Sequence, residues 1–128
     1  MRNRDYSFYY WIPAIVWMGL ILVGGSPYGF FIGNKVRHFT YMSQVLKGIF
    51  HIGEFAILTV FILIPLNKRK LNFGSIITWA IIMGSGVALL SECSQFLFSS
   101  HQLFEWIDLG MNEVGIGVVL LFYSRKAN

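Results

Sequence analysis

Long stretches without charge are the feature that most constrains this chain. No charged residue occurs between Tyr6 and Asn34, and residues 8–23 within that stretch are almost entirely apolar. A helix needs about 20 mostly apolar residues to cross the hydrocarbon core of a bilayer. Only 12% of the 128 residues are charged, whereas a soluble domain carries about 25%. We therefore expect an integral membrane protein that forms one domain over residues 1–128.

The composition excludes two other classes of protein. A disordered chain needs low hydrophobicity and high charge, but 55% of these residues are hydrophobic. A secreted module held together by disulfides is excluded because Cys93 is the single cysteine. We interpret the net charge of +4 as a signal for orientation in a membrane, and we expect no nucleic acid partner.

Four membrane spans are predicted, which gives an all-α fold: a bundle of four transmembrane helices. The spans run over about 8–23, 48–66, 73–96 and 106–123. The first is expected to end at the Gly-Gly-Ser-Pro sequence of 24–27, and the second at Pro65 and the basic residues after it. The fourth span is the weakest, because Asp108, Asn112 and Glu113 fall in its first turns.

The basic residues orient these spans. An even number of spans places both termini and the 67–72 loop on one side of the membrane. Seven of the ten Lys and Arg residues lie on that side: Arg2, Arg4, Lys68, Arg69, Lys70, Arg125 and Lys126. Loops rich in Lys and Arg stay in the cytoplasm. We therefore expect a multi-pass protein whose N- and C-termini are both cytoplasmic.

A short amphipathic helix is predicted in the first outer loop, over Lys35–Leu46. Helical spacing gathers apolar residues such as Val36 and Phe39 on one face, and polar residues such as Arg37 and Gln44 on the other. A helix of this kind lies in the membrane interface. An irregular loop with aromatic anchors is the alternative.

The acidic residues gather on one side of the predicted membrane. Five of the six fall in the outer halves of the spans or in the second outer loop: Glu54, Glu92, Glu105, Asp108 and Glu113. Ionisable groups inside a membrane are costly, so they usually face the interior of a bundle and mark function. This clustering is the strongest functional signal in the sequence.

Helical spacing then places polar side chains on one face of each of three spans. The residues are Lys47, His51 and Glu54 on the second span, Glu92 and Gln95 on the third, and Asp108, Asn112 and Gly115 on the fourth. Glu113 lies well round the fourth span from this stripe. Because the three faces lie at matching depth, we predict one polar pocket that opens outward.

The predicted pocket residues fall into two groups by expected role. The candidate catalytic residues are His51, Glu54, Glu92 and Asp108. The candidate substrate-binding residues are Lys47, Gln95 and Asn112. A histidine beside carboxylates can act as a general acid or base, and the same groups could instead hold a divalent metal. The chain has no H-E-x-x-H motif, so no cofactor is assigned.

Structural roles are the alternative for several of these residues. Lys47 could extend to the membrane interface, and Asp108 could cap the fourth helix. Gly115 and Gly117 could allow close packing of helices. If the whole cluster only holds the helices together, the protein is a non-catalytic binding or accessory module.

The order and spacing of these motifs resemble the VanZ-like family of small polytopic membrane proteins, named after a protein that gives low-level resistance to the glycopeptide teicoplanin. The resemblance covers roughly residues 44–120. The matching positions are His51, Glu54, Phe55, Glu92, Gln95, Asp108, Asn112 and Gly115. The chain departs from the family at Lys47, which stands four residues before the histidine instead of three, and at Ser91, where an acidic residue is common. The usual arginine of the outer loop is missing.

The resemblance implies a bacterial plasma membrane protein that affects susceptibility to antibiotics directed at the envelope. The implied partners are membrane lipids, together with a lipid-linked envelope component or a lipoglycopeptide. The pocket would bind or modify such a molecule, although the resemblance carries a phenotype and no particular reaction. A homodimer is a further possibility for so small a bundle.

The predicted orientation can be tested by cysteine labelling in cells. We expect a cysteine introduced at Gln102 to react with an impermeant thiol reagent on intact cells, and one introduced at Asn72 to stay unlabelled. Both variants are made with Cys93 replaced by serine. The reverse labelling pattern would move the acidic residues to the cytoplasmic side.

Overall fold

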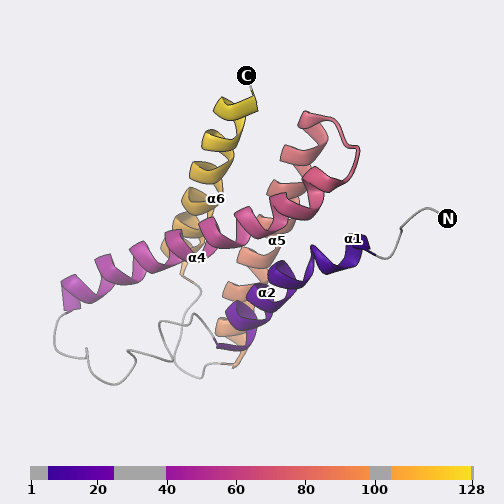
Figure 1. Ribbon diagram of the computed structural model, residues 1–128. Coiled ribbons are helices and arrows are strands. Elements are labelled where there is room, and N and C mark those ends of the chain that lie inside the picture. The colour runs from indigo at the N-terminus through magenta and orange to yellow at the C-terminus, as the bar shows by residue number, and fades with distance from the viewer. Residues whose placement is uncertain (1–5, 25–39, 99–104, 128) are drawn as a thin grey trace.

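The computed structural model describes residues 6–24, 40–98 and 105–127 of the chain (Figure 1). Every regular element in these ranges is an α-helix, which confirms the all-α fold class. The elements are α1 (Tyr6–Tyr9), α2 (Ile12–Gly24), α4 (Thr40–Lys68), α5 (Phe73–Phe98) and α6 (Trp106–Ala127). Segments of α4, α5 and α6 are long and apolar enough to cross a membrane. The chain is a small multi-pass membrane protein with three candidate spans in its described part.

The first predicted span is shorter than expected. Proline has no backbone N–H, and its ring clashes with the carbonyl four residues earlier in a helix. Pro13 accordingly lies in the first turn of a new helix: α1 ends at Tyr9 and α2 begins at Ile12. With 13 residues, α2 is about 20 Å long, which is less than the hydrocarbon core of about 30 Å.

The first turns of α4 differ from the prediction for the outer loop. From Thr40 the backbone continues without a break into the span. The short interfacial helix predicted over Lys35–Leu46 is therefore not a separate element from Thr40 onward, and 35–39 lie outside the described residues. No proline occurs between Thr40 and Ile64, so nothing in the sequence stops the helix between the loop and the span.

The end of α4 also differs from the prediction. The helix passes Pro65 and ends at Lys68. A proline within the last turn removes one backbone hydrogen bond but leaves the turn possible. The amide of Asn67 donates to the carbonyl of Leu63 at 2.9 Å, which adds a side-chain hydrogen bond across the same turn.

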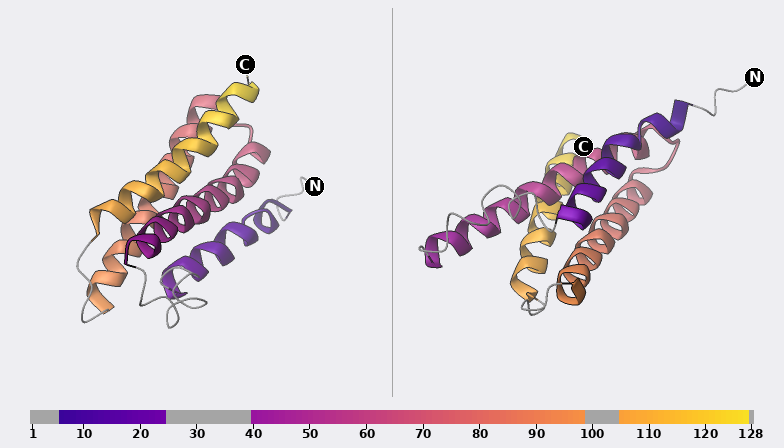
Figure 2. Two further views of the ribbon diagram at one scale, coloured as in Figure 1. Left: turned by 90° about the vertical axis from the view of Figure 1, so that its left-hand side faces the viewer. Right: turned by 90° about the horizontal axis from the view of Figure 1, so that it is seen from below.

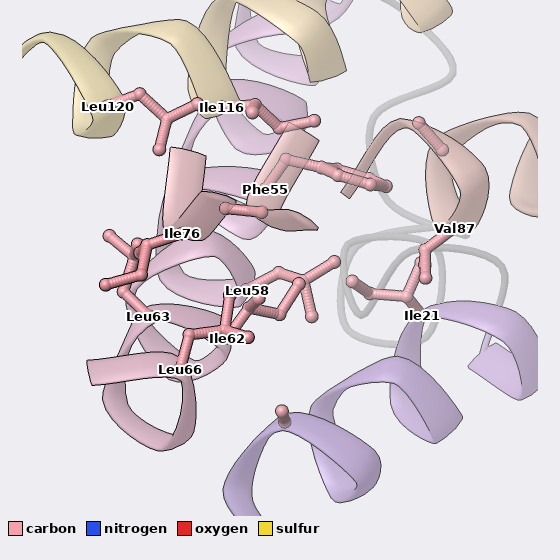
Figure 3. Packing of buried hydrophobic residues seen from close by; sticks show 13 residues of the cluster. Ile21, Phe55, Leu58, Ile62, Leu63, Leu66, Ile76, Val87, Ile116 and Leu120 are labelled. Carbon is pink, nitrogen blue, oxygen red and sulfur yellow. The ribbon is translucent and has the colours of Figure 1, made fainter. Parts of the chain in front are cut away.

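The arrangement of the helices places α4 in the middle. It has its most extensive contact with α6, and it also packs against α5 and α2. Figure 2 shows these helices running alongside one another, with α2 on the flank of α4 that faces away from α6. The core that joins them is apolar: Phe55, Leu58 and Ile62 of α4 are fully buried beside Ile116 of α6 and Ile21 of α2 (Figure 3).

Gly115 sets the distance between α4 and α6. A Cβ atom at this position would run into the backbone carbonyl of Ile52 and would lie 3.1 Å from the backbone nitrogen of Ala56. The missing side chain therefore allows the two backbones to touch. The close-packing role predicted for Gly115 is confirmed. Gly117 does not share it, because a Cβ there would meet nothing within 4 Å among the described residues.

This difference makes the two glycines a matched pair for mutation. We expect Gly115→Ala to lower the free energy of unfolding by about 1–3 kcal/mol, because α4 and α6 must separate to admit the methyl group. Gly117→Ala should be neutral, since its methyl group enters open space. Thermal unfolding of both variants in detergent micelles checks this prediction. Equal melting temperatures for the two variants would contradict the close contact at Gly115.

Candidate functional site

A group of polar side chains lies where α6 begins, beside residues 47–51 of α4 and near the end of α5. We define it as the polar cluster: Lys47 and His51 from α4, Glu92 from α5, and Glu105, Asp108 and Asn112 from α6 and the residue before it. His51 and Glu92 are each 2% exposed, and Asp108 and Asn112 are also buried. Five of the seven predicted site residues thus come together in this cluster, from three separate segments of the chain.

Lys47 joins α4 to two carboxylates at the start of α6. Its Nζ lies 2.6 Å from Oε2 of Glu105 and 2.5 Å from Oδ2 of Asp108. The Glu105 side chain is 47% exposed, that of Lys47 29% and that of Asp108 7%. The ion pairs therefore lead from the surface of the bundle toward its interior. Lys47 is held by these contacts and does not simply extend to the membrane interface.

His51 lies one turn deeper, between Asn112 and Asp108. Its Nδ1 is 2.9 Å from Oδ1 of Asn112, and its Nε2 is 3.5 Å from Oδ2 of Asp108. Because an amide oxygen only accepts hydrogen bonds, Nδ1 is the donor in the first contact. In a neutral ring, Nε2 then carries a lone pair and faces a carboxylate oxygen, which is also an acceptor. A proton donor between these two atoms would satisfy both.

Glu92 reaches the cluster from α5. Its side chain is close enough to Asp108, Lys47 and Glu105 for their charges to act on it. Its Oε1 is buried and has no hydrogen-bond partner among the described residues. Glu92 therefore interacts with the cluster through its charge, and its Oε1 accepts no hydrogen bond from a described residue.

Several buried atoms of the cluster are left unsatisfied. In the described part of the chain, His51 Nε2, Glu92 Oε1 and Asn112 Nδ2 have no hydrogen-bond partner. Asp108 Oδ2 makes no ordinary hydrogen bond either, but it has the Lys47 ammonium beside it. A buried polar group without a partner costs about 1–3 kcal/mol, and native proteins contain few of them. The presence of these unsatisfied atoms in the cluster is therefore not explained by a contribution to stability.

Two predicted site residues lie outside the defined cluster. Glu54 is buried where α2 meets α4, and its backbone carbonyl accepts a hydrogen bond from Trp17 Nε1 at 3.0 Å. Gln95 is half-buried and donates to Ser91 Oγ of its own helix at 3.4 Å. The structure thus assigns Glu54 a place at the α2–α4 contact and Gln95 a contact within α5.

Glu105 is the member of the cluster that the predicted site omits. It stands three residues before Asp108, so it lies one turn before it on the same helical face. Its carbonyl accepts the backbone N–H of Leu109 at 3.2 Å, so Glu105 occupies the position just before the first turn of α6. Asp108 lies inside that turn, so it is not the cap of α6, the structural alternative for this residue. A carboxylate there still interacts favourably with the helix dipole.

Glu113 lies on a different surface, as its helical position predicts. Its carboxylate accepts a hydrogen bond from Ser85 Oγ of α5 at 2.9 Å, and the contact is exposed. It therefore joins α5 to α6 outside the polar cluster and serves as a matched acidic control for the buried carboxylates.

The described residues form no metal site at the polar cluster, and the groove that they form is not part of it. Among the described residues, no group of three or more His, Cys, Asp or Glu side chains is arranged to hold a metal ion. A groove of about 530 Å³ lies on the face of α4 between α2 and α6, and its lining is apolar: Trp17, Ala56, Ile57, Val60, Phe61 and Val119. This groove contains no residue of the polar cluster and is not the predicted polar pocket.

No family model matches this sequence, and no curated protein or solved structure matches it. The resemblance to the VanZ-like family therefore rests on the motif positions alone.

The two ion pairs of Lys47 should differ in their contribution to stability. We expect Asp108→Asn to lower the free energy of unfolding by about 1–3 kcal/mol, because Asp108 is buried and its loss weakens contacts with both Lys47 and His51. Glu105→Gln removes an exposed pair, which is worth about 0–1 kcal/mol. Thermal unfolding of both variants in micelles measures the difference. A larger loss for Glu105→Gln would contradict the burial of Asp108.

Proposed function

We propose that this protein is a VanZ-like protein of the bacterial plasma membrane whose polar cluster binds or modifies a lipid or lipid-linked envelope component. This activity changes the susceptibility of the cell to teicoplanin and related glycopeptides. The proposal includes a fourth span that contains α2, cytoplasmic termini, and a polar cluster near the outer surface.

The observation that carries this proposal is the set of buried, unsatisfied polar atoms in the cluster. A network that only holds helices together gains stability by satisfying every member, because an unpaired group inside a membrane protein has no water to bind. His51 Nε2 and Glu92 Oε1 are buried without hydrogen-bond partners in the described part of the chain. A bound molecule that supplies these hydrogen bonds explains their retention.

The motif positions add support. Four positions of the VanZ-like pattern come from three helices and lie in one cluster: His51, Glu92, Asp108 and Asn112. Asp108 and Asn112 are one helical turn apart, but His51 and Glu92 come from segments far from them in the sequence, so local structure does not explain the cluster. Residues that a family pattern singles out, and that the fold then gathers, are good candidates for a shared site.

The distribution of basic residues supports the outward orientation. Arg125 and Lys126 lie in the last turn of α6, at the end opposite to the polar cluster. Lys68 ends α4 and Arg69 follows it. Their charged groups lie 5.4 Å and 5.5 Å from the ring centres of Tyr10 and Trp11, respectively. Positive charge favours the cytoplasmic side, which leaves the cluster on the outer side.

A second candidate function follows from the contacts that are satisfied. Lys47 ties α4 to α6 through Glu105 and Asp108, and the His51–Asn112 hydrogen bond joins the same helices. On this alternative the cluster only stabilises the bundle, and the protein is a non-catalytic accessory module. The two functions predict different effects on antibiotic tolerance and on stability when the polar side chains of the cluster are replaced.

Mutation of the unsatisfied residues separates the two functions. We expect Glu92→Gln to abolish the antibiotic tolerance that the wild-type protein confers, while membrane levels and melting temperature stay near those of wild type. The reason is that groups retained for activity contribute little to stability. His51→Ala should also abolish tolerance, but with a lower melting temperature, because it removes the hydrogen bond to Asn112 and leaves a cavity. Teicoplanin susceptibility, protein accumulation and thermal unfolding are measured together on each variant.

Glu113→Gln is the matched control, because it neutralises a carboxylate on the exposed α5–α6 surface and should keep full tolerance. If the cluster is only structural, Glu92→Gln should instead destabilise the protein by about 1–3 kcal/mol. Loss of phenotype in proportion to loss of protein would contradict the proposed function.

A further inference from the structure

The charges of the polar cluster are unbalanced. Among the described residues, Lys47 is the one lysine or arginine in the cluster. Its ammonium group already contacts the carboxylates of Glu105 and Asp108. Two carboxylates thus oppose one ammonium group before Glu92 is counted. The cluster therefore has more negative than positive groups, and an anionic ligand would meet repulsion there.

The unsatisfied atoms point to the same kind of ligand. In a neutral ring whose Nδ1 donates to Asn112, His51 Nε2 is an acceptor, and Glu92 Oε1 is an acceptor as a carboxylate. Both residues are 2% exposed, so bulk water does not solvate these atoms. Asn112 Nδ2 is a buried donor that also has no described partner, but it is a neutral amide. The buried end of the cluster therefore has acceptors without partners and no positive charge of its own among the described residues.

Lys47 shows which chemical group meets both needs. Its ammonium group contacts two carboxylate oxygens at 2.5 Å and 2.6 Å. A primary ammonium has three N–H donors and one positive charge. A second group of this kind inside the cluster would donate to the buried acceptors while it balances the excess negative charge.

We propose that the polar cluster binds a primary ammonium group carried by a membrane lipid headgroup. The inference rests on the proposed function and names the class of ligand for the same site. The exposed side of the cluster, at Glu105 and Lys47, lies at the end of the candidate spans, which is the depth of the lipid headgroups. A headgroup amine therefore enters from the exposed side of the cluster, where the carboxylate of Glu105 already contacts an ammonium group.

Binding to lipids that differ only in the headgroup tests the inference. The full chain in detergent micelles is titrated with short-chain phosphatidylethanolamine and with phosphatidylcholine of the same acyl length, and heat is measured by calorimetry. Phosphatidylcholine keeps the charge but has no N–H donor. We expect phosphatidylethanolamine to bind about tenfold more tightly or better, because hydrogen bonds to charged groups are the stronger ones.

Two variants locate the binding. We expect Glu92→Gln to weaken phosphatidylethanolamine binding about tenfold, because it removes a charged acceptor. Glu113→Gln, on the exposed α5–α6 surface, should leave the affinity unchanged. The comparison of headgroups on the wild-type chain decides the matter if Glu92→Gln fails to fold.

The remaining outcomes separate this inference from the proposed function. Equal affinity for the two headgroups, or tighter binding of phosphatidylglycerol, would overturn the ammonium ligand. The proposed function would survive if phosphatidylglycerol bound more tightly and Glu92→Gln abolished its binding. Free ethanolamine that binds as tightly as the lipid would overturn the lipid source of the amine. If no lipid binds and Glu92→Gln keeps full antibiotic tolerance, both proposals fail.

Discussion

The contact of Gly115 with the backbone of α4 determines the rest of the structure. Without a Cβ atom at this position, α6 lies directly against Ile52 and Ala56. Asn112 then lies one turn along α6 and bonds to His51, and Asp108 lies a further turn along and meets Lys47. The same register buries Ile116 in the apolar core. One close approach between two helices therefore builds both the core and the polar cluster.

The two ends of the bundle use polar residues in different ways. At the end where α4 finishes, the hydroxyl of Tyr123 donates to Asn67 Oδ1, and its ring stacks on Phe73 at a centroid distance of 5.7 Å. These polar groups are partnered and lie near the surface, which is typical of a structural contact. At the other end, His51 Nε2 and Glu92 Oε1 are buried without such partners in the described residues. The contrast within one molecule favours a ligand site at the second end.

Much of this could be predicted from the sequence because membranes impose simple rules. Uninterrupted apolar stretches gave the three long helices, and helical spacing from His51 and Asp108 gave most of the cluster. Other features depend on tertiary contacts. The first turns of α4 join the span because nothing stops the helix there, although the pattern also fits an interfacial helix. Glu105 belongs to the cluster only because Lys47 of another helix reaches it, and no spacing within one segment reveals such a pair.

The central claim is that the polar cluster is a ligand site and not a structural contact. A density map of the full chain, crystallised in a lipid phase made from its host membrane, tests it most directly. We predict non-protein density at hydrogen-bond distance, about 2.7–3.2 Å, from both His51 Nε2 and Glu92 Oε1. A map in which these two atoms bond to protein groups, with no density between them, would contradict the account.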